Sequence, residues 1–175
     1  MTKNKLKENL NPSLHYLVDW SYSDMYRQLS KNIYEMLLNN YDEEKIDICC
    51  SWFCGTDYDF FNKMGYDCHY YDMDKVVCEA NKNLTNNVHN VDVIFDDVVF
   101  RNGVIINKFC ENTFPIGKLY KGNFILVGSD NNHLSNINKI CDTNTLINQN
   151  DLTEVYEEST FFYNHNFYLV AGCNI

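Results

Sequence analysis

Short apolar runs alternate with longer amphipathic segments along most of the chain, and this alternation predicts strands separated by helices. The runs are three to five residues long and mostly apolar, as in strands that are covered on both faces. We predict strands at residues 46–50, 68–71, 91–95, 104–106 and 124–127. Because parallel neighbours need a crossover connection that is usually helical, the pattern indicates βαβ units and a mostly parallel sheet.

The amphipathic segments have the spacing of helices. The longest begins at Ser23, which offers an N-cap, and continues to about Asn40, with apolar positions at Met25, Leu29, Ile33, Met36 and Leu37. Shorter helices are predicted at 57–64, where Gly65 ends the pattern, and at 75–84. These helices fall between the predicted strands, as a βαβ arrangement requires.

The end of the chain has a different pattern. Residues 154–162 and 167–172 are two β-rich runs separated by Tyr163–Asn166, which predicts an antiparallel hairpin. Added to the edge of the parallel strands, this hairpin makes the sheet mixed. We therefore predict an α/β fold, with helices on both faces of a mostly parallel sheet and a C-terminal antiparallel β-hairpin.

The length of 175 residues fits one domain, residues 1–175, and the scarcity of proline gives no sign of an interdomain linker. Within it, residues 1–21 form a polar N-terminal arm with isolated aromatic residues, which we expect to lie across the body of the domain. Hydrophobic residues make up 45% of the chain, which is enough to build a core.

Charge and cysteine content narrow the possible partners and the location. The formal net charge is −10, and the 14 lysines and arginines are scattered, so nucleic acid is an unfavourable partner. No run approaches the roughly 20 apolar residues of a membrane-spanning helix, and the start does not read as a secretory signal, so we expect a cytoplasmic protein with no membrane partner. Most of the eight cysteines lie in apolar runs, which favours free buried thiols.

Acidic residues follow two of the predicted strands. In parallel α/β sheets ligands bind beyond the carboxyl ends of the strands. Asp72 follows the second strand, where a carboxylate can accept both ribose hydroxyl protons, and Asp74 comes two residues later. Asp96 and Asp97 follow the third predicted strand and could accept a hydrogen bond from an adenine amino group. Capping of the next helix is the alternative for the first pair, but acids after both strands favour a nucleoside site.

The turn after the first strand contains one glycine, Gly55, and lacks the G-x-G-x-x-G pattern of dinucleotide sites. A plain tight turn is therefore an alternative to a cofactor cradle there. Cys49, Cys50 and Cys54 lack the C-x2-C spacing of zinc sites, so we expect no bound metal. Cys110 stands beside Glu111 without a histidine near it in sequence, which disfavours a cysteine nucleophile.

Taken together, the chain resembles small S-adenosylmethionine (SAM)-dependent methyltransferases of the Rossmann-like class over about residues 23–173. More narrowly, it resembles a group of short methyltransferase-like proteins common in bacteriophages and bacteria. That group has G-S-W-Y-G in the first turn and I-D-x-D after the second strand, similar to residues 50–55 and 71–74 here. It has I-I-N-T-S-C-E-H after the fourth strand, and an L-Q-S-N-N-like segment and H-I-N after the fifth. Residues 105–112, 126–132 and 136–138 are similar to these motifs.

Three of the differences from the group bear on its chemistry. Cys50 stands in place of a glycine, with one extra residue before Gly55, and Asn112 and Asn136 stand in place of histidines. If those histidines serve the group's chemistry, this protein binds the ligand without turning it over. If the remaining positions suffice, it is an active enzyme.

The resemblance implies a SAM-dependent methyltransferase that acts on a small or non-nucleic-acid acceptor, which can be a small molecule or an exposed group of a protein. It implies S-adenosylmethionine as the cofactor, bound by Cys50, Ser51, Trp52, Gly55, Asp72, Met73, Asp96, Asp97 and Asn107. Asn107 is expected to orient the acceptor, and Glu111 is a possible general base. The alternative is a catalytically degenerate protein that binds SAM, a nucleoside or a regulatory partner. In a virus its location would be the host cytoplasm.

Overall fold

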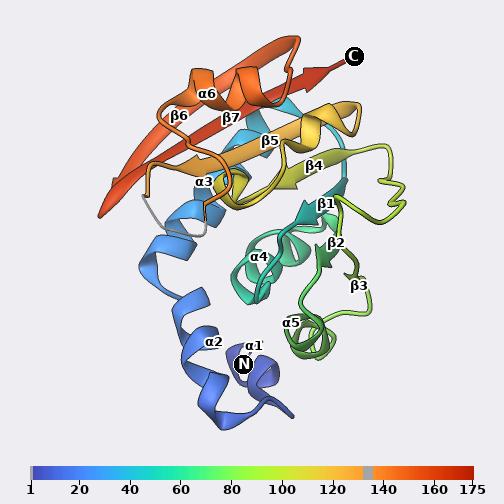
Figure 1. The fold of residues 1–175 in the computed structure, drawn as a ribbon. Coiled ribbons are helices and arrows are strands. Elements are labelled where there is room, and N and C mark those ends of the chain that lie inside the picture. Colours follow the sequence, from blue (N-terminus) through green and yellow to red (C-terminus); the bar gives the residue numbers. More distant parts are fainter. Residues whose placement is uncertain (1, 132–135) are drawn as a thin grey trace.

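The computed structural model describes residues 2–131 and 136–175, in which seven strands form one sheet in the order β3-β2-β1-β4-β5-β7-β6 (Figure 1). The first five strands are parallel, and β7 lies antiparallel between β5 and β6. This arrangement confirms the predicted mixed sheet. The strands are β1 Lys45–Cys49, β2 Asp67–Asp72, β3 Val88–Asn90, β4 Val104–Asn107, β5 Gly122–Ser129, β6 Glu154–Tyr163 and β7 His165–Asn174.

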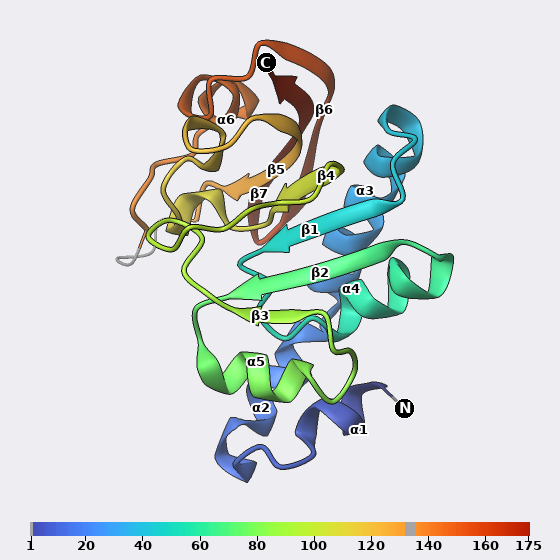
Figure 2. The same ribbon diagram turned by 90° about the vertical axis from the view of Figure 1, so that its right-hand side faces the viewer.

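Helices cover both faces of the sheet, as predicted. On one face, α3 (Asp24–Asn40) and α4 (Gly55–Phe60) pack over the core, while α6 (Thr143–Gln149) covers the other face near β5 and β7. The remaining helices, α1 (Thr2–Lys7), α2 (His15–Ser21) and α5 (Lys75–Asn81), gather beyond the β3 end of the sheet (Figure 2). Four short 3₁₀ turns complete the described elements: η1 Pro12–Leu14, η2 Asn62–Met64, η3 Cys110–Asn112 and η4 Ile116–Lys118.

The local signals for the early helices are confirmed with small changes of boundary. The Ser23 side chain accepts a hydrogen bond from the backbone N–H of Tyr26 and caps α3, whose buried face includes the five predicted apolar positions. The predicted helix at 57–64 is divided into α4 and η2, and Gly65 ends it with a left-handed φ of 96°. The helix predicted to end at Leu84 ends at Asn81.

The third predicted strand, 91–95, is wrong. The strand that pairs with β2 is β3, three residues earlier, and the apolar run that follows it forms a turn. Two aspartates cause this turn: the Asp92 carboxylate accepts the N–H of Ile94, and the Asp96 carboxylate accepts the N–H of Asp92. Side-chain acceptors of this kind compete with the ladder of a sheet. The apolar run buries Val93 in the core instead of extending the sheet.

Two helical regions carry too weak a pattern to be predicted. The N-terminal arm is largely helical, and its fully buried Leu6 and Val18 pack in one cluster with Val77 and Ala80 of α5. The polar helix α6 buries a single residue, Leu146, and is capped by Asp142, whose carboxylate accepts the N–H of Thr145 at 2.7 Å. With so few apolar positions, neither region has a clear helical periodicity.

All eight cysteines are free, and six of them are buried, which confirms their interpretation as small apolar side chains. Cys141 is exposed and Cys50 is partly buried. Among the helices of residues 2–131 and 136–175, none combines the length and the apolar content that a membrane span needs.

Candidate functional site

The strand order reverses between β1 and β4, which lie side by side with Cys49 paired to Asn107. Such a switch point leaves an opening beyond the carboxyl ends of the strands, where α/β proteins bind their ligands. The segments that follow β1, β2, β4 and β5 meet at this edge. Two pockets lie among them, and a further hollow of about 510 Å³, lined by residues 129–131 and 136–141, lies beside the end of β5.

The first pocket, which we call the β2 pocket, has a volume of about 390 Å³. It is lined by residues 71–73, 91–95 and 112–114 together with Cys50 and Ile137. Its mouth carries four well-exposed apolar side chains, Met73, Phe95, Phe114 and Ile137. Exposed apolar groups gathered around a hollow are typical of a surface that a ligand covers.

Asp72 lies in the β2 pocket and ties the end of β2 to the first turn. Its two carboxylate oxygens accept the backbone N–H groups of Trp52 and Asp74, each at 2.9 Å. Burial raises the pKa of Asp72, while these two hydrogen bonds lower it. Because an ionised carboxylate has about four acceptor positions, Asp72 can still accept hydrogen bonds from a ligand in the pocket.

The first turn is held in an unusual backbone conformation. Cys50 and Trp52 have positive φ angles of 52° and 50°, and Ser51 donates its N–H to the carbonyl of Tyr71. Cys50 occupies the position of a glycine in the resembling group, and a left-handed φ is the property that glycine supplies at no steric cost. Burial raises the pKa of the Cys50 thiol to about 12, so the thiol is neutral at physiological pH.

Replacing Cys50 with glycine should therefore cost little stability. Relief of the left-handed strain, about 1–2 kcal/mol, offsets the lost side-chain contacts and the flexibility of glycine. We expect C50G to unfold within about 1 kcal/mol of the wild type in urea titrations. The matched change C49G, in a fully buried β1 position, should cost about 2 kcal/mol or more. An equal loss in both variants would contradict the strain at Cys50.

Two buried oxygen atoms at the carboxyl ends of β1 and β4 have no hydrogen-bond partner in the described part of the chain. They are the Ser51 hydroxyl after β1 and the Oδ1 of Asn107 at the end of β4. The Nδ2 of Asn107 donates to Thr113, so only its acceptor is unused. Buried polar groups are rarely left unpaired. Neither Ser51 nor Asn107 lines the β2 or the β5 pocket, but Cys50 beside Ser51 and Thr113, which Asn107 contacts, line the β2 pocket.

Other residues predicted to bind the cofactor do not line the β2 pocket. Asp96 and Asp97 are exposed and do not line the β2 pocket, and Asp92 lines it instead. Trp52 lines neither pocket and contributes its backbone N–H to Asp72. Gly55 packs against the N-terminal helices: a Cβ there would lie 2.1 Å from the Tyr22 hydroxyl. The motif position Asn132 falls outside the described residues.

The second pocket, which we call the β5 pocket, has a volume of about 220 Å³ and adjoins the first, since Asn112 lines both. It lies between the residues after β4, the end of β5, the start of β7 and the α2–α3 region. Both positions where asparagine replaces a histidine of the resembling group, Asn112 and Asn136, line it. Its other lining residues are Trp20, Met25, Phe109, Glu111, Ser129, Asn131, His165 and Phe167.

Glu111 is the buried acid of the β5 pocket, with only 6% of its surface exposed. Its carboxylate accepts two hydrogen bonds from Ser129, one from the N–H at 3.2 Å and one from the hydroxyl at 2.8 Å. Burial raises the pKa of Glu111, and the hydrogen bonds oppose this effect. Neighbouring Cys110 is buried under the loop and its thiol pKa is raised well above the usual range, so it is not a nucleophile in this state.

The raised pKa of Glu111 predicts how the stability of the protein changes with pH. The folded state binds this proton more tightly than the unfolded state, so the contribution of Glu111 to stability grows as the pH falls through the raised folded pKa toward 4.5. Urea unfolding at several pH values should show the wild type gaining stability relative to E111Q as the medium becomes more acidic. A difference that stays flat, or that shrinks on acidification, would contradict the burial effect.

A buried ion pair supports the first turn from below. Lys108, next to Asn107, is paired with Asp57 of α4, and both side chains are almost fully buried. The same ammonium donates to the carbonyl of Ser51 at 3.3 Å, and the Ser30 hydroxyl donates to the other oxygen of Asp57 at 2.8 Å. No sequence pattern indicated this pair, because its members are separated by 51 residues.

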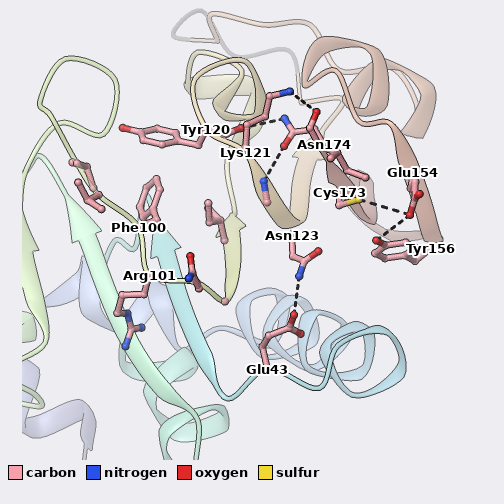
Figure 3. Close-up of a pocket in the computed structure, with 17 residues that line it drawn as sticks. Glu43, Phe100, Arg101, Tyr120, Lys121, Asn123, Glu154, Tyr156, Cys173 and Asn174 are labelled. Atoms are coloured by element: carbon pink, nitrogen blue, oxygen red, sulfur yellow. Dashed lines mark hydrogen bonds between the residues drawn. The ribbon is translucent and has the colours of Figure 1, made fainter.

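A wider pocket of about 830 Å³ lies at the opposite edge of the sheet, beside the amino ends of β4 and β5 (Figure 3). Several of its polar side chains are already hydrogen-bonded: Asn123 donates to the Glu43 carboxylate at 2.8 Å, and Lys121 donates to the backbone carbonyl of Ile175 at 3.0 Å. Because ligands of α/β sheets bind at the carboxyl ends of the strands, we assign the candidate site to the two smaller pockets.

Metal chemistry has no support in the described residues, where no three His, Cys, Asp or Glu side chains are grouped as metal ligands. Cys49, Cys50 and Cys54 do not form such a group.

No protein-family profile matches the chain, and no curated protein matches it in sequence. Solved structures do match it. The magnesium protoporphyrin IX methyltransferase ChlM from Synechocystis PCC 6803 with bound SAM aligns with a TM-score of 0.68 at 9% identity, covering 100% of this chain and 98% of that chain. The N-methyltransferase NodS from Bradyrhizobium japonicum WM9, in complex with S-adenosyl-L-homocysteine (SAH), aligns with a TM-score of 0.64 at 12% identity, covering 99% and 98%. The PH0226 protein from Pyrococcus horikoshii OT3 aligns with a TM-score of 0.62 at 12% identity, covering 87% and 93%.

At these identities the likeness establishes the fold, which is that of the class I SAM-dependent methyltransferases. This confirms the fold expected from the sequence resemblance.

Proposed function

We propose that this protein is a SAM-dependent methyltransferase that acts on a small-molecule acceptor. The observation that carries the proposal is that two pockets meet at Asn112 on the carboxyl edge of a methyltransferase-type sheet. One pocket has acids and apolar walls suited to a nucleoside, and the other has room for a second small molecule.

The β2 pocket fits the nucleoside part of the cofactor. Its volume of about 390 Å³ falls in the usual range of small-molecule sites. We assign the ribose hydroxyl groups to Asp72 and the adenine amino group to Asp92, which takes the role first expected of Asp96 and Asp97. The apolar side chains at the mouth offer surface to the base. The unpaired oxygens of Ser51 and Asn107 are available to the polar end of the cofactor.

Asp92 should distinguish adenine from hypoxanthine. A carboxylate accepts a hydrogen bond from the amino group of adenosine but repels the carbonyl oxygen of inosine. The wild type should therefore bind adenosine about ten-fold or more tighter than inosine. In D92N the amide can turn its donor toward the carbonyl, and calorimetry should show most of this preference lost. The matched variant D97N should keep it, because Asp97 is exposed and lies outside the pocket. Equal preference in all three proteins would contradict the assignment.

The chemistry asked of the protein is mainly positioning. When bound, the cofactor supplies a methyl carbon that its sulfonium centre makes electrophilic. The chain must hold the acceptor within about 3–3.5 Å of that carbon and exclude water. Asn112, shared by both pockets, lies where such an acceptor would meet the cofactor. Glu111 is available as a base for an acceptor that arrives protonated, because its raised pKa brings it closer to neutrality.

The departures from the resembling group favour a changed acceptor over lost chemistry. Asn112 and Asn136 both line the β5 pocket, and of the two only Asn112 also lines the β2 pocket. Replacements in the second pocket alter which molecule it accepts and leave Asp72 and Asp92 in place, while the third departure, Cys50, lines the β2 pocket. The net charge of −10 further favours a neutral or cationic acceptor over nucleic acid.

Calorimetric titration of the purified protein with SAM and SAH, with the recovered ligand analysed by mass spectrometry, tests this function. We expect micromolar binding of both, with SAM recovered intact when no acceptor is present. Binding followed by breakdown of SAM would indicate a cleaving enzyme. No binding of either ligand would overturn the proposal and favour the alternative of a partner-binding protein that has kept the fold.

A further inference from the structure

The β5 pocket is lined by a buried carboxylate that has no lysine, arginine or histidine hydrogen-bonded to it among residues 2–131 and 136–175. Only 6% of the Glu111 surface is exposed. Ser129 is the one other described residue that donates hydrogen bonds to its carboxylate, through its backbone N–H and its hydroxyl. The adjacent Lys108 is directed to Asp57. No positively charged group of residues 2–131 and 136–175 contributes to the pKa of Glu111.

A buried carboxylate of this kind has lost its hydration without gaining an opposite charge. Buried charges in proteins are almost always paired with an opposite charge or neutralised by a proton, because desolvation of an isolated ion is costly. The two donors of Ser129 offset part of that cost. A cationic group entering the pocket would meet the remainder, and the pocket is a hollow of about 220 Å³ that can hold one small organic molecule.

The other walls of the pocket suit the same kind of ligand. Trp20, Phe109 and Phe167 line it, and Trp20 is half exposed, at 51%. Aromatic faces attract organic cations through their quadrupole, and they also accept the apolar part of an amine. The net charge of −10 adds a long-range attraction for positive ligands.

We propose that the β5 pocket binds a small organic ammonium ion, with Glu111 as its counter-ion, and that the methyl acceptor is therefore an amine. The substrate class rests on the proposed function, whereas the binding of an ammonium ion does not. In the transfer it implies, the ammonium gives one proton to Glu111, and the freed electron pair of nitrogen bonds to the methyl carbon. The electron pair of the broken C–S bond stays on sulfur, and the sulfonium becomes a neutral thioether. The product leaves as a methylated ammonium ion.

Three probes of similar shape and different charge test the inference: benzylamine, benzyl alcohol and benzoate. Each is titrated into the protein by calorimetry, with and without saturating SAH. We expect benzylamine to bind about ten-fold or more tighter than benzyl alcohol, and benzoate to bind more weakly than either. Wild-type protein that binds the alcohol as tightly as the amine would overturn the inference.

Two variants test whether Glu111 causes the preference for benzylamine over benzyl alcohol. E111Q should bind benzylamine and benzyl alcohol with similar affinity, while E79Q, which removes an exposed carboxylate on α5, should behave as the wild type. Retained SAH binding by E111Q shows that the variant is folded, and an amine preference that persists in it would overturn the role of Glu111. If E111Q fails to fold, the probe series on the wild type still decides whether the pocket selects an ammonium ion.

The two proposals fail in different ways. Loss of the SAM-dependent function would appear as absent SAM and SAH binding with the amine preference intact. Failure of the present inference would appear as normal SAH binding without any preference among the three probes.

Discussion

Replacing Lys108 with methionine should lower the free energy of unfolding by about 3–5 kcal/mol. The change leaves the Asp57 carboxylate almost fully buried without its cation, and removes the donor to the Ser51 carbonyl. Removing one partner of a buried pair costs this much because the remaining charge stays desolvated. Urea unfolding followed by circular dichroism measures the loss.

Two further variants separate this effect from a loss of packing. The double variant K108M/D57N should recover most of the lost stability, because it buries no unpaired charge and the new amide oxygen can still accept the Ser30 hydroxyl. K63M breaks the Lys63–Asp59 pair, in which the lysine side chain is 58% exposed, and should cost less than about 1 kcal/mol. A double variant as unstable as K108M would show that the charge of Asp57 is not the cause.

Replacing Asp72 with asparagine should weaken the binding of SAH by about 1.5–3 kcal/mol, which is roughly ten- to a hundred-fold in Kd. The amide keeps one oxygen for the Trp52 N–H but loses the charge and the second oxygen, which accepts the Asp74 N–H. We assign the remaining acceptor positions of the ionised carboxylate to the ribose hydroxyl groups. The fold should survive with a loss of about 1 kcal/mol, the usual value of one hydrogen bond. Calorimetry gives the affinity and urea unfolding gives the stability.

Asp74 provides the matched control for Asp72. Its carboxylate caps α5 by accepting the N–H groups of Val76 and Val77, and it does not line the β2 pocket. Since asparagine caps helices about as well as aspartate, D74N should leave both affinity and stability nearly unchanged. Unchanged SAH affinity in D72N would contradict the ribose assignment, and equal losses in D72N and D74N would indicate a general effect of removing charge at this edge.

The functional meaning of the Lys108–Asp57 pair follows from its place. It connects the loop after β4 with the start of α4 directly beneath the carbonyl of Ser51, so it holds the two segments that border the cofactor side of the site. A rigid support of this kind compensates for the positive φ angles of Cys50 and Trp52.

The apolar pattern alone was sufficient for most of the fold, because it reflects local physics. Strands covered on both faces must be apolar throughout, so four of the five predicted parallel strands are confirmed, and the C-terminal run with its short break became the β6–β7 hairpin. Capping is equally local, and Ser23 marked the start of α3 correctly. Position after a strand likewise singled out Asp72, which lines the β2 pocket.

The errors arose where a residue's partner is distant in sequence. The apolar run at 91–95 has the composition of a strand, but β2 pairs with the residues that precede it. As a result, the acid that lines the β2 pocket after this segment is Asp92 and not the predicted Asp96. Hydrogen bonding of Glu111 to Ser129, and of Lys108 to Asp57, joins residues 18 and 51 positions apart. Composition and periodicity describe each segment separately, and such pairings depend on which segments become neighbours. The sequence by itself therefore determined the type of sheet and the edge that carries the site, whereas only the tertiary structure decided which acids face the pockets and which charge is left unpaired.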